Sequence, residues 1–435
     1  MTPLQNLRRN FGKVLTGTFL VSGLNLVALT LNTNALGLLM FGQLMVIQSV
    51  TELFSGIYSF NTWQSLSKFG SDDLEAGNLS RLRKRYHFAL LLDLGAAILA
   101  ALSGILVFLF FIETFGLDQS LVSLGIFYAI SAGFQVRSAS QGIFRLTERF
   151  EIPIMFNVAE AFVLAVNAAV LWWIDAPFAW YIYTIAIVHI ITAVSVSICG
   201  LVLVNRLESA AGRSDAPDFS RREFLGFAVA VSANGTIGIM LRRGEVLIVS
   251  ALLGPAAAGL FGVAFRGAFL LARFANAGKI SIYPVLAKLV SAGNVAEARL
   301  TVWKASRPVA GIAVLIFLAM IPLGRPILEF VFGAEFGAAH PNLLWLMAGT
   351  LTNACLFGAI PLIELTIGAS RTLIFACIAF VAFLLAAFVG MSNFGLIAAG
   401  VGSTAFFFTM AALVIWQIQR IRAANLTIAP SQDTI

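Results

Sequence analysis

The chain has 435 residues, of which 59% are hydrophobic and 11% are charged, against roughly 45–50% and about 25% in ordinary globular proteins. So few charged groups cannot cover a water-soluble fold, which excludes a soluble protein and favours a surface in contact with lipid. The net charge of +7 comes from 28 Lys and Arg against 21 Asp and Glu; the basic residues lie mainly between apolar segments, where they suit anionic lipid headgroups rather than nucleic acid.

Apolar segments long enough to cross a bilayer, which takes about 20 residues, follow one another along the whole chain. They are residues 14–35, 39–62, 87–112, 119–138, 153–174, 178–204, 224–253, 257–285, 302–323, 342–364, 372–391 and 395–417. The first resembles a signal peptide because Arg8 and Arg9 precede it, but it is longer than a signal-peptide core and no small-residue cleavage site ends it. We therefore expect about twelve retained transmembrane helices.

The distribution of Lys and Arg predicts the orientation of these helices. With the N-terminus in the cytoplasm, the inner segments together with the inner ends of the spans hold 23 of the 28 basic residues, and only Arg325 lies in an outer loop. The other four basic residues fall deeper inside apolar spans. Both ends of the chain are therefore expected on the cytoplasmic side. The connections at 63–86 and about 324–341 are short, so no large water-soluble domain is expected.

A polar connection at about 205–223 divides the predicted helices into two sets of six. The expected parts are an N-terminal lobe, residues 1–204, a cytoplasmic linker, residues 205–223, and a C-terminal lobe, residues 224–435. Short matches at nearly equal spacing support a repeat: Leu36-Gly37 recurs as Leu253-Gly254, and Leu146-Thr147 recurs as Leu365-Thr366. Because six is even, both halves enter the membrane from the same side, which predicts parallel repeats with a transport site between them.

The seventh and eighth spans contain four arginines, each of which costs about 2.5–3.5 kcal/mol or more in a bilayer. They are Arg242, Arg243, Arg266 and Arg273, and Glu245 follows the first two. Arg266 and Arg273 are seven residues apart and share one helix face. We interpret these arginines as a cationic cavity for a phosphate- or carboxylate-bearing substrate, because guanidinium binds phosphate oxygens in pairs. The alternative is a structural pair of Arg242 with Glu245, with the other side chains reaching a membrane interface.

Two positions are open for the turn between these spans. A turn at Gly254-Pro255 keeps Arg242 to Glu245 inside a long seventh helix. A helix that ends at Leu241 instead makes those residues an outer turn. The repeat favours the first position, because it aligns Gly254 with Gly37.

Two further ionisable side chains are candidates for ion coupling. Glu52 in the second span can balance an arginine, bind a coupling H⁺ or Na⁺, or form a structural pair. His189 in the sixth span suits proton coupling, although a single His on a helix is more often hydrogen-bonded within the structure. Other polar groups that join helices or line a cavity are Asn25, Asn157, Glu160, Asn167 and Asn353. Sequence motifs for ATP hydrolysis, for zinc-dependent hydrolysis and for a nucleophilic Ser are absent. We therefore predict neither an enzyme nor a cofactor nor a metal.

The segment from Arg243 to Arg266 combines a charged residue, an apolar run, Leu-Gly-Pro, small residues and Gly-aromatic. This pattern resembles the start of the second half of bacterial polysaccharide flippases, the Wzx-type O-antigen and exopolysaccharide exporters of the MOP superfamily. Residues 280–289, 328–336 and 367–371 are similar to the segments that follow in that family. The family often has a single Asp-Arg-like pair where this chain has Arg-Arg-Gly-Glu at 242–245.

The resemblance implies a V-shaped carrier of two lobes in the bacterial inner membrane. Such a carrier moves undecaprenyl-diphosphate-linked oligosaccharide from the inner to the outer leaflet by alternating access, for lipopolysaccharide or exopolysaccharide biosynthesis. The implied partners are the lipid-linked oligosaccharide, membrane lipids, a polysaccharide polymerase and a chain-length regulator. Two other classes stay open: a MATE-like antiporter, which would need a net acidic cavity, and a membrane-embedded glycan polymerase or transferase, which would need a large catalytic loop.

Overall fold

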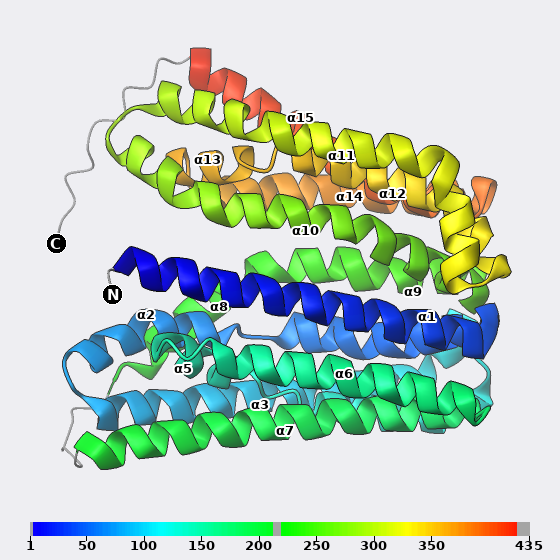
Figure 1. Cartoon of the computed structure of the whole chain (residues 1–435), viewed down its shortest axis with the longest axis horizontal. Coiled ribbons are helices and arrows are strands. Elements are labelled where there is room, and N and C mark those ends of the chain that lie inside the picture. Colours follow the sequence, from blue (N-terminus) through cyan, green and yellow to red (C-terminus); the bar gives the residue numbers. More distant parts are fainter. Residues whose placement is uncertain (1–2, 212–218, 424–435) are drawn as a thin grey trace. The chain divides into compact units, whose positions relative to one another are not determined.

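The computed structural model describes residues 3–211 and 219–423, and helices are the regular structure throughout this part of the chain (Figure 1). The chain folds as two compact units, residues 1–247 and 248–435. The first holds α1 (Pro3–Tyr58), α2 (Thr62–Glu75), α3 (Leu79–Phe110), α4 (Val122–Ala132), α5 (Ser138–Leu146), α6 (Glu151–Trp173), α7 (Phe178–Ala211), α8 (Arg221–Ile239) and the π-helical turn η3 (Met240–Gly244). After α9 (Glu245–Leu253), the second holds α10 (Pro255–Ser291), α11 (Val295–Phe332), η4 (Ala334–Ala339), α12 (His340–Cys355), α13 (Ala359–Thr366), α14 (Ala369–Phe394) and α15 (Ile397–Ala423).

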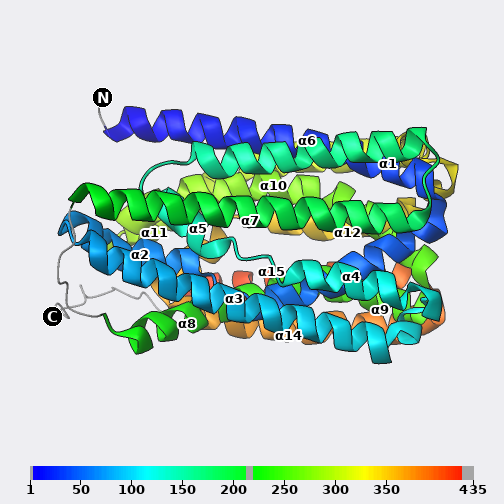
Figure 2. The same ribbon diagram turned by 90° about the horizontal axis from the view of Figure 1, so that it is seen from below.

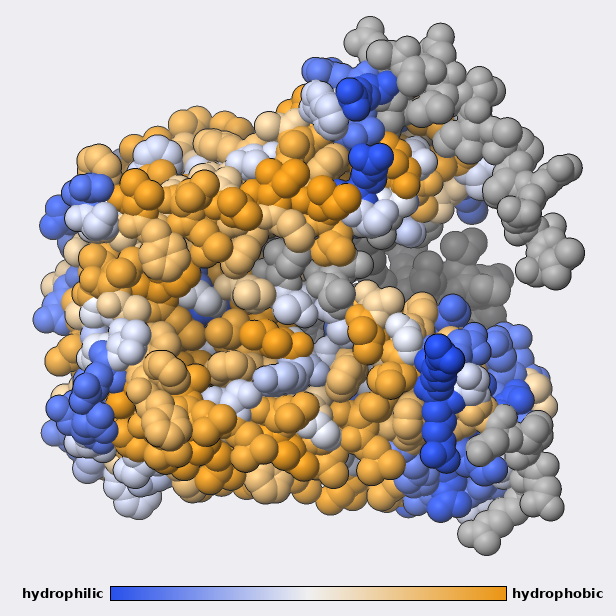
Figure 3. All heavy atoms as spheres, turned by 180° about the vertical axis from the view of Figure 1, so that it is seen from behind, coloured by the Kyte–Doolittle hydropathy of each residue, from blue (hydrophilic) through white to orange (hydrophobic). Residues whose placement is uncertain are grey.

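Long apolar helices confirm the predicted all-α membrane fold. By length and composition, seven described helical segments suit a membrane crossing, and the bent pair Ala334–Cys355 and Ala359–Thr366 makes an eighth. The first of these segments is interrupted at Gly37, so each of the twelve predicted spans coincides with a helix or a broken helix. On the face drawn in Figure 3, apolar side chains cover the middle of each unit and hydrophilic ones gather at its ends, as a bilayer requires.

The internal repeat is visible in where the helices begin. The starts of α4, α6 and α7 are Val122, Glu151 and Phe178, and those of α12, α14 and α15 are His340, Ala369 and Ile397. Each helix of the second set begins at nearly the same distance along the chain from its counterpart in the first. α4 and α5 form a broken span, and its counterpart in the second unit is the broken pair α12 and α13. The spacing of whole helices therefore supports the repeat that two short sequence matches predicted.

Two glycines confirm the predicted turns of this repeat. Gly37 has a φ of 65° and Gly254 a φ of 87°, values that residues with a Cβ rarely adopt. The helix continues from α8 through η3 into α9 and breaks at Gly254. The structure thus supports the long seventh helix and places Arg242 to Glu245 within it rather than in a turn.

Two connections that the sequence predicted as loops are largely helical. Residues 63–86 contain most of α2 and the first turns of α3. Buried Asp73 of α2 holds the two helices together: it accepts hydrogen bonds from Arg81 Nε and, at 2.6 Å, from Arg85 Nε. Residues 324–341 contain the end of α11, all of η4 and the first residues of α12. Gly333, with a φ of 107°, ends α11.

The first compact unit ends later in the chain than the predicted linker at 205–223. α8 and η3 pack against α1, and α8 also packs against α2, so these elements belong to the first unit rather than to the second. Of the predicted linker, residues 205–211 continue α7 to its end at Ala211, and α8 begins at Arg221. The division of the chain into two lobes of six helices each stays a prediction.

Candidate functional site

Two helix breaks in the first unit are joined by one buried carboxylate. The chain leaves α1 at Tyr58 and enters α2 at Thr62, and it leaves α4 at Ala132 and enters α5 at Ser138. Asp93 of α3 is 6% exposed; its Oδ1 accepts from Thr62 Oγ1 at 2.7 Å and its Oδ2 accepts from the Ala139 N–H at 2.7 Å. A carboxylate at the first N–H groups of a helix stabilises that end. Asp93 therefore fixes where α5 begins.

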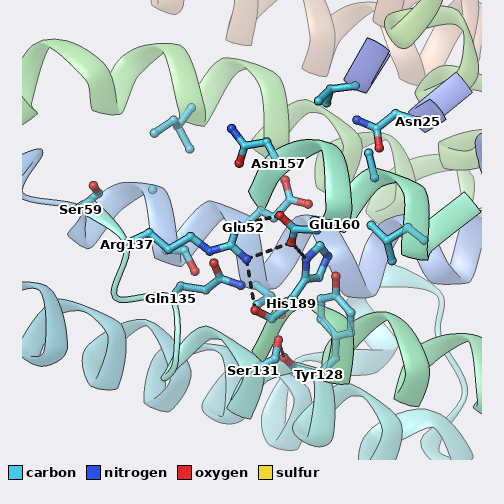
Figure 4. Close-up of a pocket in the computed structure, with 17 residues that line it drawn as sticks. Asn25, Glu52, Ser59, Tyr128, Ser131, Gln135, Arg137, Asn157, Glu160 and His189 are labelled. Carbon is cyan, nitrogen blue, oxygen red and sulfur yellow. Dashed lines mark hydrogen bonds and ion pairs between the residues drawn. The ribbon is translucent and has the colours of Figure 1, made fainter. Parts of the chain in front are cut away.

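The residue before α5 is Arg137, and it forms the centre of a charged group that we call the Arg137 cluster: Arg137, Glu160 and His189. Arg137 donates from Nη1 to Glu160 Oε2 at 2.8 Å and from Nη2 to Glu160 Oε1 at 2.9 Å (Figure 4). His189 Nδ1 lies 2.7 Å from Glu160 Oε1, and the His189 carbonyl accepts from Arg137 Nη2 at 3.1 Å. α6, which supplies Glu160, packs against both α1 and α7 (Figures 1 and 2), so the cluster lies inside the unit.

A second ion pair joins the second half of α1 to η3. Arg243 Nη2 contacts Glu52 Oε2. α8 approaches α1 closely just beside this pair: a Cβ at Gly56 would lie 2.5 Å from Ile239 Cγ2. The π-helical turn that follows Ile239 is a local departure from α-helical geometry of a kind often found at functional sites.

Arg242, the neighbour of Arg243, leaves a positive charge near this pair. Its side chain is exposed and lies over Gly238, where a Cβ would be 3.2 Å from Arg242 Nη1. Within the described part of the chain, it forms neither a hydrogen bond nor an ion pair. Arg242, Arg243 and Glu52 together carry one net positive charge, which suits an anionic group.

Glu52 and the Arg137 cluster line one pocket of about 530 Å³ in the first unit. Its walls come from α1, α4, the segment between α4 and α5, α6, α7 and α8. Uncharged polar side chains also line it, among them Asn25, Ser55, Ser59, Gln135 and Asn157. In Figure 4, Asn25 and Asn157 lie along the upper side of the view, and Gln135 and Ser131 lie below the Arg137 cluster.

The structure brings some of the sequence-predicted site residues together and leaves others apart. Glu52 and His189 line the pocket, and Arg243 pairs with Glu52. Glu52 contacts an arginine, and His189 is hydrogen-bonded within the structure. A role of either residue in ion coupling stays a prediction.

Arg242 and Arg243 do not line this pocket. Glu245 is fully buried in α9, and Arg266 is half-buried in α10 of the second unit. The side chain of Arg273 lies outside the described residues. Substrate binding by Arg242, Arg243, Arg266 and Arg273 therefore stays a prediction. Of the unranked polar residues, Asn167 joins two helices, because its Nδ2 donates to Thr184 Oγ1 at 2.9 Å.

Sequence reasoning missed Arg137, which lies at the inner end of the predicted fourth span, residues 119–138. The available signal was Glu160, an acid alone in an apolar helix, which needs a cationic partner. Counted from the starts of the corresponding helices, Glu160 of α6 and His189 of α7 correspond to Ile378 of α14 and Phe408 of α15. Arg137, the residue before α5, corresponds to Gly358, the residue before α13. The second repeat therefore builds the same helices without these charges.

Broken membrane helices and paired charges around a polar pocket are features often found in membrane transporters. Solved structures share the fold of this chain. An inward-facing MATE family multidrug resistance transporter of the MOP superfamily matches with a TM-score of 0.70 at 14% identity, covering 95% of this chain and 96% of that chain. The lipid II flippase MurJ, in an inward closed conformation, matches with a TM-score of 0.66 at 11% identity, covering 93% of this chain and 87% of that chain. The fold is that of MOP superfamily transporters.

The family follows from the sequence match. The chain belongs to the polysaccharide biosynthesis protein family, whose sequence model matches residues 7–290. The inner membrane protein YghQ of Escherichia coli (strain K12) is 26% identical over 330 residues, which cover 73% of this chain and 90% of YghQ. These matches confirm the resemblance that the Arg243 to Arg266 segment indicated, and the protein is a multi-pass membrane protein.

Proposed function

We propose that this protein is a flippase that carries an undecaprenyl-diphosphate-linked oligosaccharide across the bacterial inner membrane, for the synthesis of a surface polysaccharide. The observation that carries this proposal is the polar pocket of the first unit, which lies among apolar helices and is lined by the Arg137–Glu160 pair and by Glu52 of the Glu52–Arg243 pair. The name of the family, polysaccharide biosynthesis, supports the class of cargo. A lipid II flippase with the same fold supports the mode of transport.

The geometry suits this task without covalent chemistry. A sugar chain needs a wet, hydrogen-bonding pocket at membrane depth, and the first unit has one. The diphosphate needs a cation that is not already neutralised, and Arg242 is exposed beside the Glu52–Arg243 pair. The polyprenyl tail is apolar and remains in the bilayer. Alternating access then moves the polar head between the leaflets, with both chain ends in the cytoplasm and coupling to H⁺ or Na⁺ as the energy source.

An antiporter for organic cations is the second candidate, because MATE transporters have the same fold. Such a site needs a carboxylate that is free to pair with the cation. Both carboxylates of the pocket are already paired, Glu160 with Arg137 and Glu52 with Arg243. The charge arrangement therefore favours the flippase, whose products a polymerase and a chain-length regulator would take up.

A deletion strain of the host bacterium tests the proposal. Loss of the chain should abolish the surface glycan and lead to accumulation of the lipid-linked oligosaccharide, and the wild-type gene should reverse both. Arg242→Ala and Arg266→Ala should each reduce export about tenfold or more at unchanged membrane abundance, because a hydrogen bond to a charged group contributes about 1.5–3 kcal/mol.

Arg325→Ala is the matched control, because Arg325 forms an exposed pair with Glu329 at 2.8 Å and such pairs contribute little. It should export normally. A deletion strain that keeps its surface glycan and accumulates no lipid-linked oligosaccharide would exclude the proposed function.

A further inference from the structure

The charged groups of the first-unit pocket neutralise one another. Arg137 binds Glu160 through two hydrogen bonds of 2.8 and 2.9 Å, and Arg243 contacts Glu52. A further anion at this pocket would meet two carboxylates whose countercharges are already used. A further cation would meet two arginines. The paired charges thus exclude most charged ligands from the pocket itself.

A group of uncharged polar side chains in the pocket, by contrast, has no partner in the described part of the chain. Asn25, Ser55, Ser59, Gln135 and Asn157 line the pocket, and their side chains form no hydrogen bond with any residue that the structure describes. Other polar side chains of the same helices are bonded: Thr51 Oγ1 donates to the Ile47 carbonyl at 3.3 Å, and Asn167 of α6 donates to Thr184. Asn25 and Asn157 are exposed and the other three side chains are half-buried, so these amides and hydroxyls are available to bond with water or with a ligand in the pocket.

The chemistry of these five groups specifies the ligand. An amide side chain offers both donors and an acceptor, and so does a hydroxyl. They match a molecule whose groups also donate and accept, such as the hydroxyl and acetamido groups of a sugar. A diphosphate only accepts hydrogen bonds, so it would leave the amide oxygens without a donor. Its negative charge would also be repelled by the two carboxylates. The volume of about 530 Å³ lies within the range of small-molecule pockets, about 300–1,000 Å³, which suits a short stretch of glycan.

We infer that the first-unit pocket is the subsite for the uncharged sugar residues of the cargo, separate from the place where the diphosphate binds. The inference rests on the proposed function, since it assigns one part of the proposed cargo to one pocket. Asn157 and Gln135 are its recognition residues, from α6 and from the break between α4 and α5. Arg242, which does not line the pocket, belongs to the diphosphate.

Binding measurements on the purified full-length protein in lipid nanodiscs separate the two parts of the cargo. One probe is the water-soluble glycan, released by mild acid from the lipid-linked oligosaccharide that accumulates in the deletion strain. The other probe is undecaprenyl diphosphate without sugar. Asn157→Ala and Gln135→Ala should each weaken binding of the released glycan about two- to tenfold, the effect of one lost hydrogen bond, and should leave binding of undecaprenyl diphosphate unchanged. Arg242→Ala should do the opposite.

Asn167→Ala is the matched control, because it removes an amide from the same helix at a position that does not line the pocket. It should bind both probes as the wild type does. Amide variants that bind the glycan normally, or that lose both probes equally, would overturn the subsite. Wild-type protein that binds undecaprenyl diphosphate but no glycan would also overturn it while leaving the flippase in place. Wild-type protein that binds neither probe would instead contradict the proposed function.

Discussion

Glu160→Ala is expected to destabilise the protein by about 3–5 kcal/mol and to abolish export. Glu160 accepts hydrogen bonds from both Nη atoms of Arg137 and lies 2.7 Å from His189 Nδ1. The three side chains are only 12–26% exposed, so the substitution leaves Arg137 as an uncompensated charge in a partly buried site, which costs about this much. Thermal unfolding in detergent, together with membrane abundance and surface glycan in the deletion strain, measures both effects.

A second substitution separates stability from function. In Glu160→Ala/Arg137→Leu the uncompensated charge is gone, so stability should recover in large part while export remains lost. Asn157→Ala, about one turn earlier on the same helix, breaks no ion pair and should unfold at the wild-type temperature. A Glu160→Ala protein as stable as the wild type would show that the Arg137 cluster is not a compensated buried pair.

Reversal of one charge at the Glu52–Arg243 pair is expected to reduce export at least about tenfold. Glu52→Arg places a third positive charge beside Arg242 and Arg243, and one like-charge contact costs about 1–4 kcal/mol between water and a partly shielded site. The double reversal Glu52→Arg/Arg243→Glu restores the pair in the opposite direction. It should recover most of the export that the single variant loses, as measured by surface glycan at equal protein abundance.

The double reversal distinguishes two roles of Glu52, because an arginine at this position cannot bind a coupling cation. If Glu52 holds H⁺ or Na⁺ directly, the reversed pair should be as inactive as Glu52→Arg. Recovery therefore assigns Glu52 to the pair that the structure shows. Failure to recover, at normal abundance, would contradict a purely electrostatic role.

The sequence was sufficient to predict the spans and the repeat because both depend on local patterns. Runs of about 20 apolar residues locate helices in a bilayer, and a glycine before a proline marks a turn. The Gly254-Pro255 turn and the helical setting of Arg242 to Glu245 followed from these signals. Residues 63–86 were wrongly predicted as a loop, because a polar segment after a span looks the same whether it forms an amphipathic helix or an irregular connection.

The centre of the candidate site was not predictable in the same way. Arg137 ends an apolar run, so the distribution of basic residues assigned it to the cytoplasm. Its true position depends on the break between α4 and α5, which Asp93 of α3 fixes through a tertiary contact with Ala139. The partnership of Glu160 with His189 likewise requires α6 and α7 to be packed together. The pairing of Glu52 with an arginine was among the expectations, but the choice of Arg243 was not.

The two repeats differ at the positions of the Arg137 cluster. The first repeat carries the charges and amides, and the equivalent positions of Arg137, Glu160 and His189 in the second repeat are apolar. At these three positions the charges therefore belong to one copy of the repeated fold. That asymmetry is expected of a carrier whose cargo has a sugar end and a lipid end.

Translocation by the purified protein in sealed vesicles tests the central claim most directly. The measured quantity is the rate at which a fluorescently labelled undecaprenyl-diphosphate oligosaccharide moves between leaflets, monitored as protection from a membrane-impermeant quencher. We expect movement with the wild type, loss of it with Glu160→Ala/Arg137→Leu, and wild-type movement with Arg325→Ala. Equal rates for the wild type and for the double variant, at equal incorporation, would contradict the account.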